Sequence, residues 1–209
     1  MLGQEDRWIN YHERLTKSSA NVVGAKPSEV VIMNALTVNI HLLLVSFYRP
    51  KKNRYKIIIE KGAFPSDQYA IESQLKFHGY DKKDALIEIE PFKGKEVIDD
   101  EEILNIIKKN GSETALIYLG GINYLSGQLF NMELITKSAK NYGVTVGFNL
   151  AHCAGNVELF LHQGVLILLL GAHINIYALA QDPHLEFLFM KTIIIGRGHG
   201  LLAGGGIIK

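Results

Sequence analysis

The chain has 209 residues, of which 47% are hydrophobic and 21% charged, and its formal net charge is +1. This composition is typical of a folded globular domain and excludes a disordered chain, a collagen and a coiled coil. Because the net charge is near zero, there is no basic field to attract nucleic acid or an anionic membrane, and we expect neither partner. A single cysteine, Cys153, and an N-terminal sequence without leader features predict a cytoplasmic protein.

The composition changes near Gln163, because only five charged residues follow it: Asp182, Glu186, Lys191, Arg197 and Lys209. We therefore divide the chain into residues 1–163, the central part of a large domain, and residues 164–209, an aberrant apolar tail. The longest apolar run of the tail, 165–170, is too short to span a bilayer. We expect this C-terminal tail to expose apolar surface and to favour aggregation.

Before this break, two hydrophobic periodicities alternate along the chain. The apolar run at 37–48, with Asn34 or Thr37 as its N-cap, is stopped by Pro50 and predicts a buried helix. In chain order, the runs that follow predict strand 56–60, helix 66–78 with Ser66 as N-cap, strand 86–90, a helix between Asp99 as N-cap and Gly111, strand 115–119, helix 132–142 and strand 144–150. Strands alternating with helices predict an α/β fold of three layers, a mostly parallel sheet with helices on both faces.

In such a sheet, ligands bind at the carboxyl ends of the strands. The segments that follow the predicted strands there are 62–67, 120–124 and 149–152. The sequence contains no P-loop, no GxGxxG after a strand, no HExxH and no GxSxG. The common cofactor and nucleophile motifs therefore do not identify a function.

Each candidate residue has a structural alternative. Thr37 either helps a helix start to bind an anion or only caps the helix, and Ser66 and Asp67 are either ligand groups or a cap and a first-turn acid. His152 is either a catalytic group or a hydrogen-bonded structural histidine, and Cys153 is interpreted as a small buried hydrophobe. We assign no chemistry to the other histidines on apolar faces: His41, His78 and His162.

Four segments resemble, in order and spacing, the large-domain core of kynureninase: VVGAKPSEVVIMNALTVNIHLLLVSFYRP, AFPSDQYAIESQLKFHG, YLGGINYLSGQLFNMELITKSAK and VGFNLAHCAGNVELFLH. The resemblance covers about residues 20–162. It implies a homodimeric fold-type-I enzyme that uses pyridoxal 5′-phosphate (PLP). It further implies hydrolysis of L-kynurenine or 3-hydroxykynurenine to anthranilate or 3-hydroxyanthranilate, with L-alanine, in tryptophan catabolism.

The resemblance also implies a set of cofactor-binding positions. Leu36 and Thr37 match residues that bind the cofactor phosphate at a helix start, and Phe64 matches the aromatic residue stacked on the pyridine ring. Gly120 stands where some relatives carry a cofactor-contacting serine, and His152 matches a histidine that contacts the cofactor. With the remainder of the cofactor loop and the residue opposite the pyridine nitrogen, the full set is Leu36, Thr37, Phe64, Pro65, Ser66, Asp67, Gly120, Asn149 and His152.

Two departures from the family pattern affect the expected chemistry. The family motif GFDLAH reads GFNLAH at 147–152, so Asn149 replaces the aspartate that keeps the pyridine nitrogen protonated. The family motif SYKY, whose lysine forms the Schiff base, is absent, since the only lysines after Gln163 are Lys191 and Lys209. The family's N-terminal cofactor and substrate segments and its small C-terminal domain are also missing. We therefore expect no intact catalytic residue and no hydrolysis by this chain as written.

We hypothesise that a shifted reading frame produced the altered tail. Back-translation of 171–176 in the neighbouring frame can read WCSYKY, 177–191 can read CSGTGPTSGVFVHE, and 198–207 can read PWLAGWWGH. All three resemble consecutive kynureninase segments, so we favour a frameshift or sequencing error near Gln163. Three functions stay open: a kynureninase whose true product differs from this chain, a non-catalytic PLP-binding or dimerising remnant, and a pseudogene product that does not fold.

Overall fold

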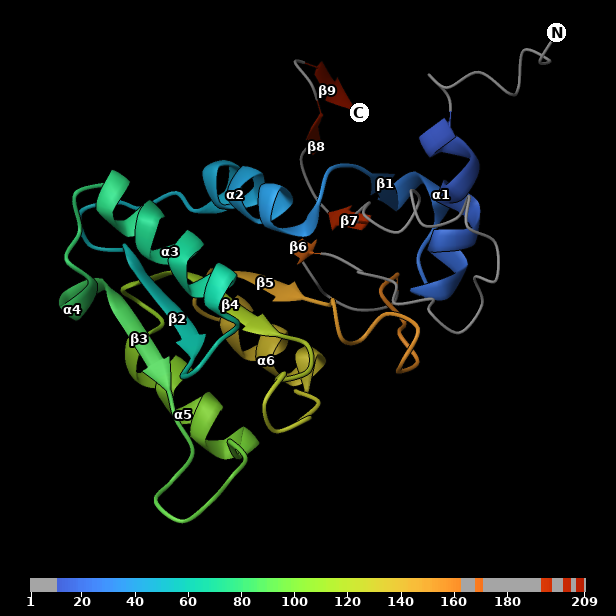
Figure 1. Cartoon of the computed structure of the whole chain (residues 1–209). Coiled ribbons are helices and arrows are strands. Elements are labelled where there is room, and N and C mark those ends of the chain that lie inside the picture. Colours follow the sequence, from blue (N-terminus) through green and yellow to red (C-terminus); the bar gives the residue numbers. More distant parts are fainter. Residues whose placement is uncertain (1–10, 163–167, 171–192, 197–200, 204–205, 209) are drawn as a thin grey trace, which may run out of the picture.

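The computed structural model describes residues 11–162, 168–170, 193–196, 201–203 and 206–208 (Figure 1). Its helices are α1 (Tyr11–Val22), η3 (Pro27–Glu29), α2 (Leu36–Phe47), α3 (Pro65–Phe77), α4 (Lys82–Ala85), α5 (Asp100–Asn110) and α6 (Met132–Lys140). Its strands are β1 (Val30–Ile32), β2 (Lys56–Glu60), β3 (Leu86–Ile89), β4 (Thr114–Gly120), β5 (Thr145–Asn149), β6 (Leu168–Leu170), β7 (Ile193–Gly196), β8 (Leu201–Ala203) and β9 (Gly206–Ile208).

Seven of these strands form one mixed sheet in the order β1-β7-β6-β5-β4-β2-β3. Strands β3, β2, β4, β5 and β6 are mutually parallel, while β7 runs antiparallel to both β6 and β1. Strands β8 and β9 form a separate antiparallel pair. The mostly parallel sheet that was predicted is therefore confirmed, and β6 and β7 of the C-terminal tail extend it.

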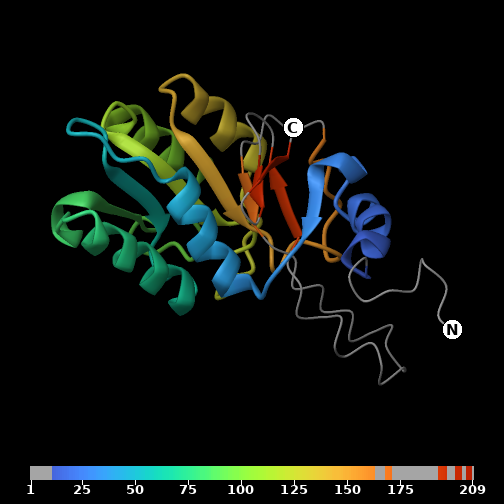
Figure 2. The same cartoon turned by 90° about the horizontal axis from the view of Figure 1, so that it is seen from above.

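Helices cover both faces of the sheet, as Figure 2 shows from above. Ile57 and Ile59 of β2 pack in one apolar cluster with α2 and α3, whereas Ile58 packs in a second cluster with α5 and α6. All three isoleucines are fully buried. Because successive side chains of a strand point to opposite faces, the unbroken apolar run of β2 is explained by burial on both sides.

The predicted helices and strands before Gln163 are all present, with ends shifted by one or two residues. Asp99 is the N-cap residue of α5 as expected, but the N-caps expected for α2 and α3 are wrong. Helix α2 begins at Leu36 after Ala35, and α3 begins at Pro65 after Phe64, so that Ser66 lies inside the helix. Asp99 does precede α5, but its side chain makes no capping hydrogen bond. A proline at the first helical position fixes φ and needs no N–H partner, which explains the earlier start of α3.

Four short or polar elements of this part were not predicted: α1, η3, β1 and α4. Helix α1 carries mostly polar residues and β1 has only three residues, so neither gives a strong periodic signal. Helix α4 is a single turn, capped by Asp81, whose carboxylate accepts a hydrogen bond from the Lys83 backbone N–H at 2.7 Å. Across the described ranges, no helix has the length and apolarity that crossing a membrane requires.

Candidate functional site

A cavity of about 190 Å³ lies at the carboxyl ends of the central strands. Glu60, Gly120 and Asn149, the last residues of β2, β4 and β5, contribute to its wall. The complete lining is Leu36, Glu60, Phe64, Asp67, Gly120, Ile122, Tyr124, Asn149, Ala151 and His152. This is the edge at which parallel α/β sheets bind their ligands.

A buried hydrogen-bond network fixes the polar wall of the cavity. Asn149 Nδ2 donates to Asp67 Oδ2 at 2.7 Å, and the Tyr118 hydroxyl donates to the same oxygen at 3.0 Å. The Ser66 hydroxyl donates to Asp67 Oδ1 at 3.2 Å. The side-chain oxygen of Asn149, Oδ1, accepts a hydrogen bond from the Ala151 backbone N–H at 3.0 Å. Asp67 and Ala151 together therefore determine the orientation of the Asn149 side-chain amide.

Burial and hydrogen bonding act in opposite directions on Asp67. The pKa of its carboxyl is raised overall, because burial outweighs the lowering by hydrogen bonds from Asn149, Tyr118 and Ser66 and by the neighbouring His152. Burial and the nearby Asp67 charge raise the pKa of the Tyr118 hydroxyl, which therefore stays protonated and donates. The network holds one carboxylate surrounded by three donors.

Glu60 is a second buried carboxyl in the same cavity. Its Oε1 accepts a hydrogen bond from the Gly120 backbone N–H at 2.9 Å, but its Oε2 is buried and has no hydrogen-bond partner in the described part of the chain. Burial, together with repulsion from Asp67, raises the pKa of Glu60 to about 7. The cavity therefore contains a carboxyl group that gains or loses a proton near neutral pH.

Two aromatic side chains stand at the mouth of the cavity. Phe64, just before α3, and Tyr124, after β4, meet edge to face with ring centroids 5.2 Å apart. Phe64 is 47% exposed and Tyr124 38% exposed, so each presents ring surface that is not used by the core. Such surface is suited to stacking against a flat ligand.

The start of helix α2 borders the cavity at Leu36. The N-cap residue Ala35 provides no side-chain hydrogen bond to the first turn. Instead, the buried Asn39 anchors the approach to the helix, because its Nδ2 donates to the Asn34 carbonyl oxygen at 2.9 Å. Unpaired N–H groups and the helix dipole at such a start attract an anion.

The cavity brings together six of the nine positions predicted from the sequence: Leu36, Phe64, Asp67, Gly120, Asn149 and His152. Thr37 and Pro65 are exposed beside it, and Ser66 contributes through its hydrogen bond to Asp67. Thr37 does not cap α2, which removes that structural alternative. Three further lining residues, Ile122, Tyr124 and Ala151, lie in the segments 120–124 and 149–152 that were expected to follow the strands, whereas Glu60 was missed.

The sequence contained a signal for the residue that was missed. Glu60 is a charged residue at the end of an apolar strand, and acidic side chains are rarely buried unless they are paired. Cys153, in contrast, agrees with its interpretation: it is fully buried, and burial raises the pKa of its thiol to about 12. Among the described residues, no cluster of three or more His, Cys, Asp or Glu side chains is arranged to hold a metal ion.

Curated proteins similar to this chain are kynureninases. The kynureninase of Myxococcus xanthus is 56% identical over 156 residues, which cover 75% of this chain and 37% of that protein. The kynureninase of Coccidioides immitis is 53% identical over 157 residues, covering 75% of this chain and 33% of that protein. The chain belongs to the kynureninase family. It spans little more than a third of the length of these relatives, and no family model matches it.

Solved structures confirm the fold of this kynureninase-family chain. A cysteine desulfurase from Thermococcus onnurineus superposes with a TM-score of 0.69 at 18% identity, covering 89% of this chain and 42% of that one. A NifS-like protein gives a TM-score of 0.68 at 17% identity, covering 93% and 50%. The chain therefore has the fold-type-I architecture of PLP-dependent enzymes, as the sequence predicted.

Proposed function

We propose that this chain is the PLP-binding core of a kynureninase-type hydrolase. Its complete form would hydrolyse L-kynurenine and 3-hydroxykynurenine to anthranilate and 3-hydroxyanthranilate, releasing L-alanine, in the cytoplasmic catabolism of tryptophan. The observation that carries the proposal is a single cavity lined by three features that suit the three parts of PLP. A helix start for an anion, an exposed aromatic ring and a buried carboxylate–amide pair all line it.

The residues present fit PLP. The first turn of α2, at Leu36 and Thr37, would hold the phosphate, and Phe64 would stack on the pyridine ring. Asn149 would hold the pyridine nitrogen, since its buried amide lines the cavity and is held in place by its hydrogen bond to Asp67. When bound, PLP supplies an electron sink for the carbanion that forms during cleavage of the substrate.

Asn149 should weaken that chemistry. An amide can donate a hydrogen bond to the pyridine nitrogen but supplies no negative charge to keep it protonated. The Asp67 carboxyl, to which the Asn149 amide donates, is one hydrogen bond further away. We therefore expect a low rate even in a form of the protein that contains every other catalytic residue.

The chain as written should hold PLP without a covalent bond. The family's cofactor-linking lysine belongs to a motif that is absent from the C-terminal tail, and the tail's Lys191 and Lys209 lie outside the described residues. Without that motif, the chain lacks the amine that the family uses to link the cofactor and to shuttle the substrate proton. The frameshift near Gln163 is part of the same proposal, as is the division into 1–163 and 164–209.

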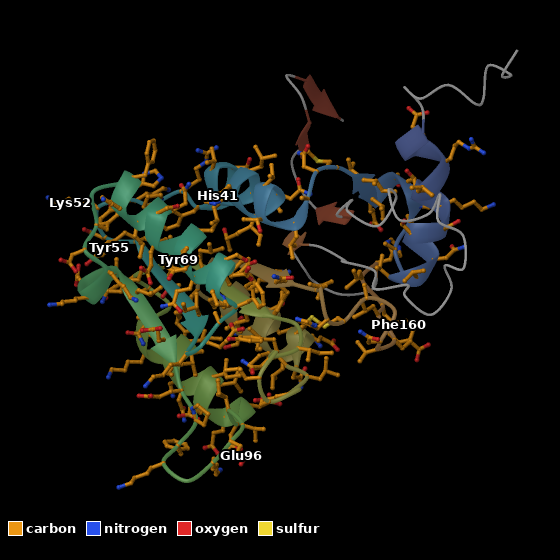
Figure 3. The ribbon with its side chains drawn as sticks, viewed as in Figure 1. His41, Lys52, Tyr55, Tyr69, Glu96 and Phe160 are labelled. Carbon is orange, nitrogen blue, oxygen red and sulfur yellow. The ribbon has the colours of Figure 1, made fainter. Side chains whose placement is uncertain are left out.

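A second candidate function is a non-catalytic module that pairs with another subunit. Helix α2 exposes three apolar side chains at helical spacing: Val38, Leu42 and Val45. The helix can be found in Figure 3 by the label of His41. An exposed apolar stripe of this kind favours a protein contact, in agreement with the homodimer that the family resemblance implies. Light scattering tests this directly, since a Leu42→Lys variant should be monomeric if the stripe is the contact.

Absorption spectroscopy of the purified chain with added PLP tests the proposal. A free-aldehyde band that saturates, together with no anthranilate fluorescence on addition of kynurenine, is the expected result. An imine band with kynurenine hydrolysis would contradict the loss of the lysine, and no saturable binding would overturn the cofactor site. Sequencing the gene and transcript across codon 163 then decides whether a base is missing or extra.

A further inference from the structure

Glu60 is the one lining residue whose buried polar atom lacks a partner in the described part of the chain. It is the last residue of β2 and is 4% exposed. Its Oε2 has neither a protein donor nor contact with solvent, although the residue lines the cavity. An ionised carboxylate in this state is costly, because burial removes its hydration and nothing replaces it. A neutral carboxyl avoids most of that cost.

The backbone around Gly120 is shaped to hold this carboxyl. The Gly120 N–H donates to Glu60 Oε1 at 2.9 Å. A Cβ atom at Gly120 would lie 3.0 Å from that oxygen and 2.9 Å from the Ile122 carbonyl oxygen. Any larger residue at position 120 would therefore press on the carboxyl. This close fit gives Gly120 a role different from that of a side chain that contacts the cofactor.

The neighbouring groups determine which carboxyl of the cavity holds a proton. Asp67 on α3 accepts hydrogen bonds from Asn149, Tyr118 and Ser66, whereas Glu60 accepts one from Gly120. The other titratable groups of the cavity are His152, which follows β5, and Tyr124, which follows β4. The negative charge is therefore better placed on Asp67, and the proton on Glu60.

We propose that Glu60 retains its proton when an anionic pyridine ligand occupies the cavity, so that ligand binding is coupled to protonation of this carboxyl. The inference rests on the proposed PLP site and adds a positioning residue to it. The phosphate of PLP would add negative charge to a cavity that already contains the Asp67 carboxyl, and an ionised Glu60 would add a further repulsion. A neutral carboxyl adds no such repulsion and leaves no charge on the buried, unpartnered Oε2.

The coupling predicts a specific pH dependence. Because the pKa of Glu60 lies at about 7, binding should be unaffected by this residue at pH 6 and should weaken progressively above pH 7. If binding requires one proton on Glu60, the affinity falls by at most about tenfold for each pH unit. The ligand carries titratable groups of its own, so the wild type must be compared with a variant at every pH.

The experiment measures the dissociation constant of PLP for the full 209-residue chain between pH 6 and pH 8.5. Glu60→Gln keeps the size of the side chain and the acceptor for Gly120 but cannot ionise. Glu102→Gln is the matched control, since Glu102 also has a buried Oε2 without a partner in the described residues, but lies on α5 and does not line the cavity. Far-UV circular dichroism confirms that both variants fold.

The expected result is a wild-type to Glu60→Gln ratio of dissociation constants that rises from about 1 at pH 6 to about 10 at pH 8. The ratio for Glu102→Gln should stay constant. If Glu60→Gln does not fold, proton uptake by the wild type at pH 8, measured by calorimetry in two buffers, is the second readout. Equal pH profiles, or no uptake, overturn this inference alone, whereas no binding at any pH overturns the proposed function and this inference with it.

Discussion

Asn149 and Asp67 are joined by a hydrogen bond of 2.7 Å between Nδ2 and Oδ2, although 82 residues separate them in the sequence. The bond connects the end of β5 to the first turn of α3 and is buried. An amide at position 149 gives the Asp67 carboxylate a donor. An aspartate at the same position, as in the family motif, would place two carboxyl groups within hydrogen-bond distance, which requires one of them to be protonated.

Asn149→Asp should therefore destabilise the chain in a pH-dependent way. We expect a loss of about 2 kcal/mol or more in the free energy of unfolding at pH 8, where both carboxyls carry charge, and a smaller loss at pH 5, where the pair shares a proton. Urea unfolding at the two pH values measures the difference. Asn123→Asp is the control, because Asn123 is equally buried but its side-chain oxygen only accepts hydrogen bonds, from Leu125 and Ser126.

The same substitution should act on turnover in the opposite direction. In a form of the protein that carries the family's lysine, Asn149→Asp should raise the rate of kynurenine hydrolysis by more than tenfold, because a carboxylate keeps the pyridine nitrogen protonated. Anthranilate fluorescence gives the rate. A change smaller than tenfold would show that the amide at position 149 does not limit the chemistry.

Glu60→Gln should change how stability depends on pH. The pKa of Glu60 is raised in the folded chain from 4.5 to about 7, so the folded state binds more protons than the unfolded state between these values. Stability contributed by this group is therefore greatest below pH 4.5 and is lost as pH rises towards 7. Relative to the wild type, Glu60→Gln should gain up to about 3 kcal/mol between pH 5 and pH 8. A difference that is constant with pH would refute the raised pKa.

Two glycines with positive φ allow the cost of backbone strain to be compared with the cost of a close contact. Gly24 and Gly79 have φ values of 62° and 79°, but a Cβ at Gly24 would overlap the Leu159 carbonyl oxygen, while one at Gly79 would meet nothing within 4 Å. Gly79→Ala should cost about 1–2 kcal/mol. Gly24→Ala should cost clearly more, because the segment after Leu159 must move, and thermal unfolding should rank the two in that order.

The fold before Gln163 could be predicted because its signals are local. Ile57 to Ile59 form an unbroken apolar run, and the next helix starts at Pro65, so strand and helix are readable from neighbouring residues. The errors arose where the signal was weak, as in the three residues of β1, or where the N-cap residue has no side-chain acceptor, as at Ala35. The pairing of β7 with β1 joins residues more than 160 positions apart and has no local signal.

The candidate site was predictable only in part, for a related reason. Phe64, Asp67 and Asn149 could be found because they follow strands and match a family pattern. Their mutual contacts depend on the order of strands in the sheet, which places β5 beside β4 and β4 beside β2. For Glu60 the acid at the end of an apolar strand was a signal of burial, but nothing in the strand indicates that Gly120 and Asp67 would enclose it.

Calorimetric titration of PLP into the 209-residue chain tests the central claim, that the cavity at the strand ends is the cofactor site. Phe64→Ala removes the ring that lines the cavity, and Phe77→Ala removes an 80% exposed ring from the same region of the chain that does not line it. The account predicts one saturable site in the wild type and in Phe77→Ala, and at least about tenfold weaker binding in Phe64→Ala. No saturable binding, or equal affinity in all three proteins, would contradict it.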